Sequence, residues 1–155
     1  MYPWVVFLHI AGVFGFLLAH GASVAAMFKL RTERRRERIR TLIELSATSM
    51  TAFYVSIVVL LGAGIVAGFI GNWWRMLWIW VSLGLFLVVA GAMYPLASGY
   101  FRRVRIAVEH RPSGAPMASD EEVDELLGSS RPLLVALVGF GGILIILWLM
   151  ILKPF

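Results

Sequence analysis

The stretch FLHIAGVFGFLLAHGASVAAMF, residues 7–28, is apolar over at least the length of about 20 residues that a helix needs to cross a membrane. It is followed directly by KLRTERRRERIR, residues 29–40, in which seven basic side chains stand beside two acidic ones. An apolar span with the positive run after it, and none before it, is typical of a retained transmembrane helix rather than a cleaved signal peptide. We therefore expect a first membrane-spanning helix over residues 4–27.

Three further stretches have the same apolar character, and they predict helices over residues 47–70, 77–100 and 132–152. Hydrophobic residues make up 60% of the 155 positions and charged residues only 15%, which is unusual for a soluble domain. No alternation typical of strands interrupts these stretches. The predicted fold is all-α, a polytopic four-transmembrane-helix bundle in a single domain, 1–155, with loops at 28–46 and 101–131.

The positive charges predict how the bundle is oriented in the membrane. Loop 28–46 is rich in arginine, and loop 101–131 begins with Arg102, Arg103 and Arg105, so both are expected on the cytoplasmic side. The short aromatic turn GNWW, residues 71–74, then lies outside, together with both termini. We expect a multi-pass protein of a bacterial cytoplasmic membrane, in contact with lipid, and interpret the net charge of +5 as topology rather than nucleic-acid binding.

The second loop contains SDEEVDELLG, residues 119–128, which has the pattern of a helix start. Ser119 and Glu122 have the spacing of a capping box, and Gly128 is a typical helix end. A short acidic helix on the cytoplasmic side is therefore expected between the third and fourth spans. Its carboxylates either lie against the arginine-rich loop or are simply solvated, and the sequence leaves both open.

Small residues indicate where the helices approach closely, because lipid provides no hydrophobic drive for helix association. They recur at Ala11, Gly15, Ala19 and Ser23 in the first helix, at Gly64 and Gly68 in the second, and at Gly139, Gly141 and Gly142 in the fourth. Pro95 removes a backbone donor and predicts a kink near the cytoplasmic end of the third helix.

Two histidines within the first span are the candidate site residues. His9 and His20 are eleven positions apart, so they differ by about 20° around the helix and by about 16 Å along it. They share a face but not a metal ion. At matching depth, His20 is expected near Tyr54 and Met93, and His9 near Ser82 and the notch formed by Gly64 and Gly68.

Each histidine has two interpretations. In the first, a histidine at membrane depth ligates haem, because the glycine notch beside it leaves room for a flat ring system. In the second, a neutral histidine donates a hydrogen bond to a hydroxyl or a backbone carbonyl, which offsets the cost of burying the ring without any cofactor. The absence of cysteine excludes disulfides, thiolate metal sites and cysteine nucleophiles, and no hydrolase or nucleotide-binding motif occurs, so whether the protein is an enzyme stays open.

Three segments, LHIAGVFGFLLAHGAS, MFKLRTER and WIWVSLGLFLVVAGAMYPLASGYFRRVR, resemble a group of bacterial membrane proteins. The chain is similar, over roughly residues 5–108, to uncharacterised four-helix integral membrane proteins related to the CopD-like and HemJ-like families. In HemJ-like proteins a histidine of the first helix is linked to haem. The resemblance implies this role for His9.

Together these observations favour a small membrane protein that binds b-type haem and takes part in redox chemistry. The candidate cofactor-binding residues are His9, His20, Met93, Tyr54 and Ser82, and no other metal is expected. One alternative is a non-catalytic accessory subunit of a respiratory or photosynthetic complex, with other membrane subunits or further copies of the chain as partners. The other is a CopD-like metal or small-molecule permease.

Overall fold

The structure, a computed structural model, describes residues 1–155 and is helical apart from turns, loops and one isolated bridge between His110 and Pro116. Its elements are α1 (Tyr2–Leu30), α2 (Arg36–Ile70), the 3-10 turn η1 (Trp73–Arg75), α3 (Leu77–Met93), the π-helical turn η2 (Tyr94–Ser98), α4 (Gly99–Val108), α5 (Asp120–Gly128) and α6 (Arg131–Leu152). Four helical segments are long and apolar enough to cross a membrane: Tyr2–Leu30, Arg36–Ile70, Leu77–Val108 and Asp120–Leu152. This confirms the predicted all-α chain with four such helices.

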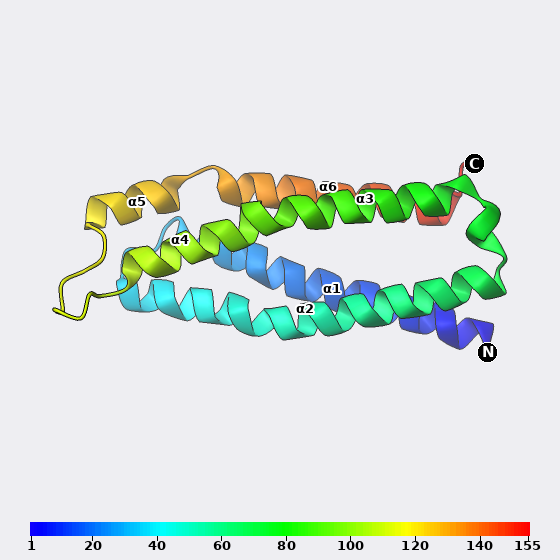
Figure 1. The fold of residues 1–155 in the computed structure, drawn as a ribbon, viewed down its shortest axis with the longest axis horizontal. Helices are drawn as coiled ribbons and strands as arrows, with labels where there is room; N and C mark the ends of the chain where they lie inside the picture. Colours follow the sequence, from blue (N-terminus) through cyan, green and yellow to red (C-terminus); the bar gives the residue numbers. More distant parts are fainter.

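Figure 1 shows the long helices side by side in two pairs, α1 with α2 and α3 with α6. Both termini and η1 lie at one end of the molecule, which we call the aromatic end. The loop between α1 and α2, together with α5, lies at the opposite end, which we call the basic end. The side of the membrane that each end faces stays a prediction.

Close backbone contact along α1 and α2 explains the first pair. A Cβ added to Gly12 would lie 2.7 Å from the backbone nitrogen of Leu60, and Gly15 faces the hydroxyl of Ser56. The contact face of α1 continues through Ala19 and Ser23, which are buried. The predicted stripe of small residues is therefore present, but it begins at Gly12, because Ala11 lies one position further around the helix and is exposed.

Two helices extend beyond the spans expected from the sequence. The second begins at Arg36 rather than at 47, and the third continues as α4 to Val108 rather than ending at 100. In both extensions apolar residues four apart are buried: Ile39 and Ile43 in α2, and Val104 and Val108 in α4. Arginines occupy the outer face of each extension. A search for uninterrupted apolar length does not find such amphipathic turns.

The third span is irregular at Pro95, as the sequence predicts. The chain passes through the π-helical turn η2 between α3 and α4. Proline lacks the donor for the usual bond to the preceding turn, and a π turn is one way in which a helix accommodates that loss.

The largest buried apolar cluster lies at the basic end and joins all the helices there. Its eleven members are Val24, Met27, Leu30, Ile39, Ile43, Tyr100, Val104, Val108, Val123, Leu127 and Val135. We call this cluster the basic-end core. Tyr100 is its largest side chain and is completely buried.

Arginines close the basic-end core on the outside. Arg36 donates to the carbonyls of Ala107 and Ala118 at 3.1 and 2.8 Å and forms an ion pair with Asp120 at 2.7 Å. Arg40 donates to the carbonyl of Val108 at 2.8 Å. The bonds to Ala107 and Val108 satisfy carbonyls at the C-terminal end of α4, where a cation is also favoured by the helix dipole, and the bond to Ala118 ties Arg36 to the segment before α5.

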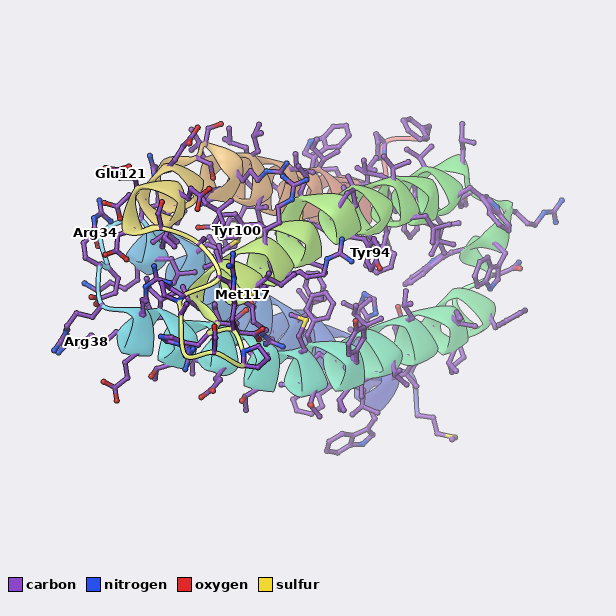
Figure 2. The ribbon with its side chains drawn as sticks, turned by 60° about the vertical axis from the view of Figure 1, so that its left-hand side comes forward. Arg34, Arg38, Tyr94, Tyr100, Met117 and Glu121 are labelled. Carbon is purple, nitrogen blue, oxygen red and sulfur yellow. The ribbon has the colours of Figure 1, made fainter.

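Helix α5 begins with the capping box expected from Ser119 and Glu122, whose reciprocal bonds measure 2.8 and 3.2 Å. Its acidic first turns face the arginine-rich loop through the Arg36–Asp120 pair and through Arg34–Asp124 at 3.1 Å. Figure 2 shows Arg34, Arg38 and Glu121 gathered at this end. The sequence left open whether the carboxylates of α5 are solvated or lie against the arginine-rich loop. In the structure Asp120 and Asp124 lie against arginines.

Candidate functional site

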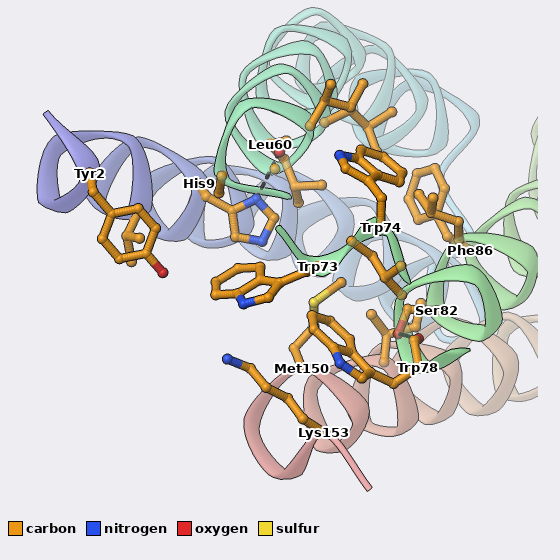
Figure 3. Close-up of a pocket in the computed structure, with 18 residues that line it drawn as sticks. Tyr2, His9, Leu60, Trp73, Trp74, Trp78, Ser82, Phe86, Met150 and Lys153 are labelled. Carbon is orange, nitrogen blue, oxygen red and sulfur yellow. Dashed lines mark hydrogen bonds between the residues drawn. The ribbon is translucent and has the colours of Figure 1, made fainter. Parts of the chain in front are cut away.

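A cavity of about 320 Å³ lies at the aromatic end, between the two helix pairs. Side chains of α1, α2, η1, α3 and α6 contribute to its lining, as Figure 3 shows. The lining is mostly apolar, which is usual for a small-molecule site, and the volume is at the lower end of the range of about 300–1,000 Å³ for such sites. The polar or charged groups in it belong to Tyr2, His9, the tryptophans, Ser82 and Lys153.

His9 is oriented in this cavity by a single hydrogen bond. Its Nδ1 donates to the carbonyl oxygen of Leu60 at 2.8 Å. Because a carbonyl only accepts, the proton of the neutral ring is on Nδ1, and the lone pair is on Nε2. Figure 3 shows this second nitrogen pointing into the cavity, toward Trp73.

A glycine makes room for the imidazole. A Cβ on Gly64 would lie 2.9 Å from Nδ1 of His9 and 3.0 Å from its Cε1, so any larger residue would displace the ring. The predicted glycine notch beside His9 is present at Gly64. Gly68 has a different neighbour, since a Cβ added there would lie 3.0 Å from the indole nitrogen of Trp74.

Tryptophans of η1 and α3 form the wall opposite His9. The indoles of Trp73 and Trp78 lie 5.8 Å apart between centroids, and Tyr2 packs edge-on against Trp73 at 6.1 Å. Asn72 allows the tight turn into η1 because it adopts the left-handed conformation, with φ of 56°. The sequence placed the turn that contains Trp73 on the outer side but did not bring Trp73 or Trp78 to His9.

Ser82 lines the same cavity, as its depth in α3 predicted. It is buried, and its hydroxyl donates to the carbonyl of Trp78 at 2.8 Å. The hydroxyl proton is therefore used within the helix, and only the oxygen lone pairs are available to a ligand. Thus the structure brings His9 and Ser82 together in one cavity.

His20 is in a different and tighter environment. Its ring stacks on Phe16 at 6.1 Å and meets the edge of Phe140 at 5.2 Å. Nε2 has no hydrogen-bond partner and lies against Gly139 of α6, where an added Cβ would overlap it. No space is left beside Nε2 for a ligand without moving α6 away from α1.

The residues expected around His20 lie elsewhere. Tyr54 is 63% exposed on the outer surface of α2, beside Phe53, and Met93 packs against the basic-end core. Helical spacing predicted their depth, but their direction depends on how α2 and α3 are rotated. The structure therefore gives His20 aromatic neighbours instead of the polar, sulfur-bearing surroundings that we expected.

Two features of the helix contacts were missed in the sequence. Ser23 of α1 meets Ser46 and Ser49 of α2 through hydroxyl bonds of 3.0 and 3.1 Å. The second feature is Lys153, just beyond α6, whose ammonium lies 4.1 Å from the ring centroid of Trp73. The spacing of Ser46 and Ser49 in α2 is a weak indication of the hydroxyl contacts. No residue near Lys153 in the sequence indicates that its ammonium lies over Trp73.

No three His, Cys, Asp or Glu side chains lie close enough together to hold a metal ion. His9 and His20 are eleven residues apart on α1, which is about 16 Å along the helix, so a single site would use only one of them. The geometry separates the candidates accordingly: Nε2 of His9 faces a cavity, whereas Nε2 of His20 faces a helix backbone.

The comparisons with known proteins agree with a membrane protein and do not identify an activity. A family model described as "Predicted integral membrane protein (DUF2269)" matches residues 3–154. No curated protein and no solved structure matches the chain. The relation to CopD-like and HemJ-like proteins stays a prediction.

Proposed function

Since the chain belongs to the DUF2269 family of predicted integral membrane proteins, and is itself a multi-pass integral membrane protein, we propose that it binds b-type haem in the cavity at the aromatic end. The observation behind this proposal is the orientation of His9, with Nδ1–H bonded to the Leu60 carbonyl and Nε2 directed into an apolar cavity. Histidines that ligate metals typically donate their other ring proton to a carbonyl or carboxylate, which holds the ring in place.

The shape of the site suits a flat ligand. Gly64 leaves the space that the imidazole uses, and the indoles of Trp73, Trp74 and Trp78 provide flat apolar surfaces in the lining. Nε2 of His9 would bind the haem iron, and the aromatic walls would exclude water. Haem bound there would provide one-electron redox chemistry, whose potential depends on the axial ligand and on burial.

His20, Tyr54 and Met93 have no part in this proposal. Ser82 keeps a supporting place, because its oxygen lines the cavity and is held by the Trp78 carbonyl. The proposal thus narrows the five candidate residues to His9, with Ser82 as a neighbour.

We also propose that the basic end is cytoplasmic and that both termini face outside. The support is the concentration of arginine in the loop between α1 and α2 and at the start of the next loop. The cavity then lies in the outer half of a bacterial cytoplasmic membrane. Accessibility of a tag at either terminus to a membrane-impermeant label tests this orientation, and labelling only after lysis would contradict it.

An absorption spectrum tests the haem proposal. Purified protein reconstituted with hemin and then separated from unbound hemin should retain a Soret band, which His9→Leu abolishes and His20→Leu keeps, because only His9 offers a free nitrogen to the cavity. Added imidazole should restore the band in His9→Ala by replacing the missing ligand. A colourless protein, or an unchanged spectrum in His9→Leu, would contradict the proposal.

A second candidate function is that of a non-catalytic accessory subunit. It is favoured by Gly84 and Gly91 of α3, two exposed glycines with open space where a side chain would be. Glycines on an outer helix surface allow another helix to approach closely. This candidate would be supported if colourless protein purified from native membranes together with other membrane subunits, and if Gly84→Leu lost those subunits.

A CopD-like permease stays a prediction. Its test is the flux of a metal or small molecule into proteoliposomes.

A further inference from the structure

We infer that the cavity at the aromatic end recognises a ligand with a carboxylate, and that Lys153 binds this group at the cavity mouth. This inference rests on the proposed function and deepens it, because it specifies the chemistry at the other end of the ligand. A planar amphiphile with an acidic edge, such as a porphyrin with propionates, belongs to this class.

The charge of the cavity supports the inference. Among the 18 residues that line it, Lys153 has the only charged side chain, and no Asp or Glu is present. Lys153 is exposed at the mouth, so water screens part of its field, and an anionic partner gains a modest amount of binding free energy there. An anionic group is the complement that such a cavity favours.

The ammonium of Lys153 has no ionic partner in the protein. The three ion pairs lie at the basic end and join Arg34, Arg36 and Arg38 to acids. Lys153 instead lies over ring faces, 4.1 Å from the centroid of Trp73 and 5.6 Å from that of Trp78. A cation held only by aromatic faces can accept a carboxylate without breaking an existing ion pair.

The backbone places Lys153 at the mouth. Lys153 ends α6 in the left-handed conformation, with φ of 45°, and its N–H bonds to the Leu149 carbonyl at 3.0 Å. This conformation is uncommon for a residue with a side chain. Figure 3 shows the resulting position, with the amino group near Trp73 and Met150 and away from Ser82 and Phe86.

These positions orient a ligand. Its acidic edge would meet Lys153 near the chain terminus, and its apolar body would lie toward Ser82, Leu83 and Phe86, with His9 at one side. An acid in the opposite orientation would lose the only cation. The expected ligand is therefore amphiphilic and enters with its apolar part first.

The test uses porphyrins with free and with esterified carboxylates. Metal-free protoporphyrin IX and its dimethyl ester are titrated into the full-length protein in a neutral detergent, and binding is measured by quenching of tryptophan fluorescence. The free acid should bind about 3- to 10-fold more tightly than the diester. Lys153→Met should remove that preference, whereas Lys153→Arg should keep it.

Arg75 provides the matched control. It is an exposed cation of η1 that does not line the cavity, so Arg75→Met should leave the preference intact. Equal affinity for acid and diester in the unsubstituted protein would overturn the inference. The same conclusion follows if Arg75→Met lowers the preference as much as Lys153→Met, since a general surface charge would then explain it.

This experiment is separate from the iron test. A Soret band that depends on His9, without discrimination between acid and diester, would overturn the role of Lys153 and leave haem ligation standing. Preference for the metal-free acid that depends on Lys153, without a His9-dependent Soret band, would support the inference and overturn haem ligation. Failure of both porphyrins to bind would overturn the inference, whatever the spectrum shows.

Discussion

The basic end and the aromatic end of the bundle are built from the two ends of the same long helices, yet only the basic end has a continuous core. There, an eleven-residue apolar cluster and the arginines around it tie α1, α2, α4, α5 and α6 together. At the aromatic end the helix pairs enclose a cavity of about 320 Å³ beside His9. The difference indicates that one end is closely packed, whereas the other leaves a cavity, in which we propose that a ligand binds.

The largest effect is expected from the centre of the basic-end core. Tyr100→Ala removes a completely buried ring and should lower the free energy of unfolding by about 3–5 kcal/mol. Tyr100→Phe should be neutral or stabilising, because the buried hydroxyl of Tyr100 has no hydrogen-bond partner. Denaturant unfolding in detergent micelles, followed by circular dichroism, measures both.

Tyr54→Ala is the matched control for that experiment, because Tyr54 is 63% exposed and should contribute little. If Tyr54→Ala and Tyr100→Ala destabilise equally, the basic end is not the stabilising core and the comparison fails.

A smaller loss is expected where arginine closes the core. Arg36→Met leaves the carbonyls of Ala107 and Ala118 without this donor and removes the pair with Asp120, which should cost about 1.5–3 kcal/mol. Arg38→Met should cost under about 1 kcal/mol, because the Arg38 side chain is exposed and lies 3.8 Å from Glu33, whose buried carboxylate keeps its bonds from the backbone N–H groups of Arg34 and Arg35. Thermal unfolding of the two variants in one detergent compares them directly. Equal losses would show that the arginines act only through overall charge.

The smallest effect on stability, but a clear one on the site, is expected at Gly64. Gly64→Ala places a methyl group 2.9 Å from Nδ1 of His9, and the overpacking should cost about 1–2 kcal/mol after the gain in helix propensity. The imidazole should move, so hemin affinity should fall. Gly62→Ala, on the open side of α2, should be neutral or stabilising. Hemin titration and denaturant unfolding of both variants measure these two effects. Unchanged hemin affinity in Gly64→Ala would show that His9 is not part of the binding site.

Several local features were predictable because their physical causes are local. The apolar length of each span, the interruption at Pro95 and the capping box at Ser119 depend on residues within a few positions of one another. Gly64 beside His9 was also predictable, because depth in a membrane bundle follows from distance along each helix. These predictions required no knowledge of how the helices are rotated.

The direction of each side chain was not predictable in the same way. His9 and His20 lie on one face of α1, but α2 passes His9 at Gly64 and α6 passes His20 at Gly139. Tyr54 matched the depth of His20 and points outward. In such an apolar chain almost every helix face is hydrophobic, so periodicity does not say which face is buried in protein and which faces lipid.

The amino-acid sequence by itself determined four helices able to span a membrane, the distribution of charge between their ends and the common level of His9, Gly64 and Ser82, because these depend on apolar length and on position along a helix. Tertiary structure alone decided that His9 faces a cavity, that His20 faces a backbone and that Lys153 lies over Trp73. These contacts depend on the rotation and crossing of helices far apart in the chain, which are set by close packing between them.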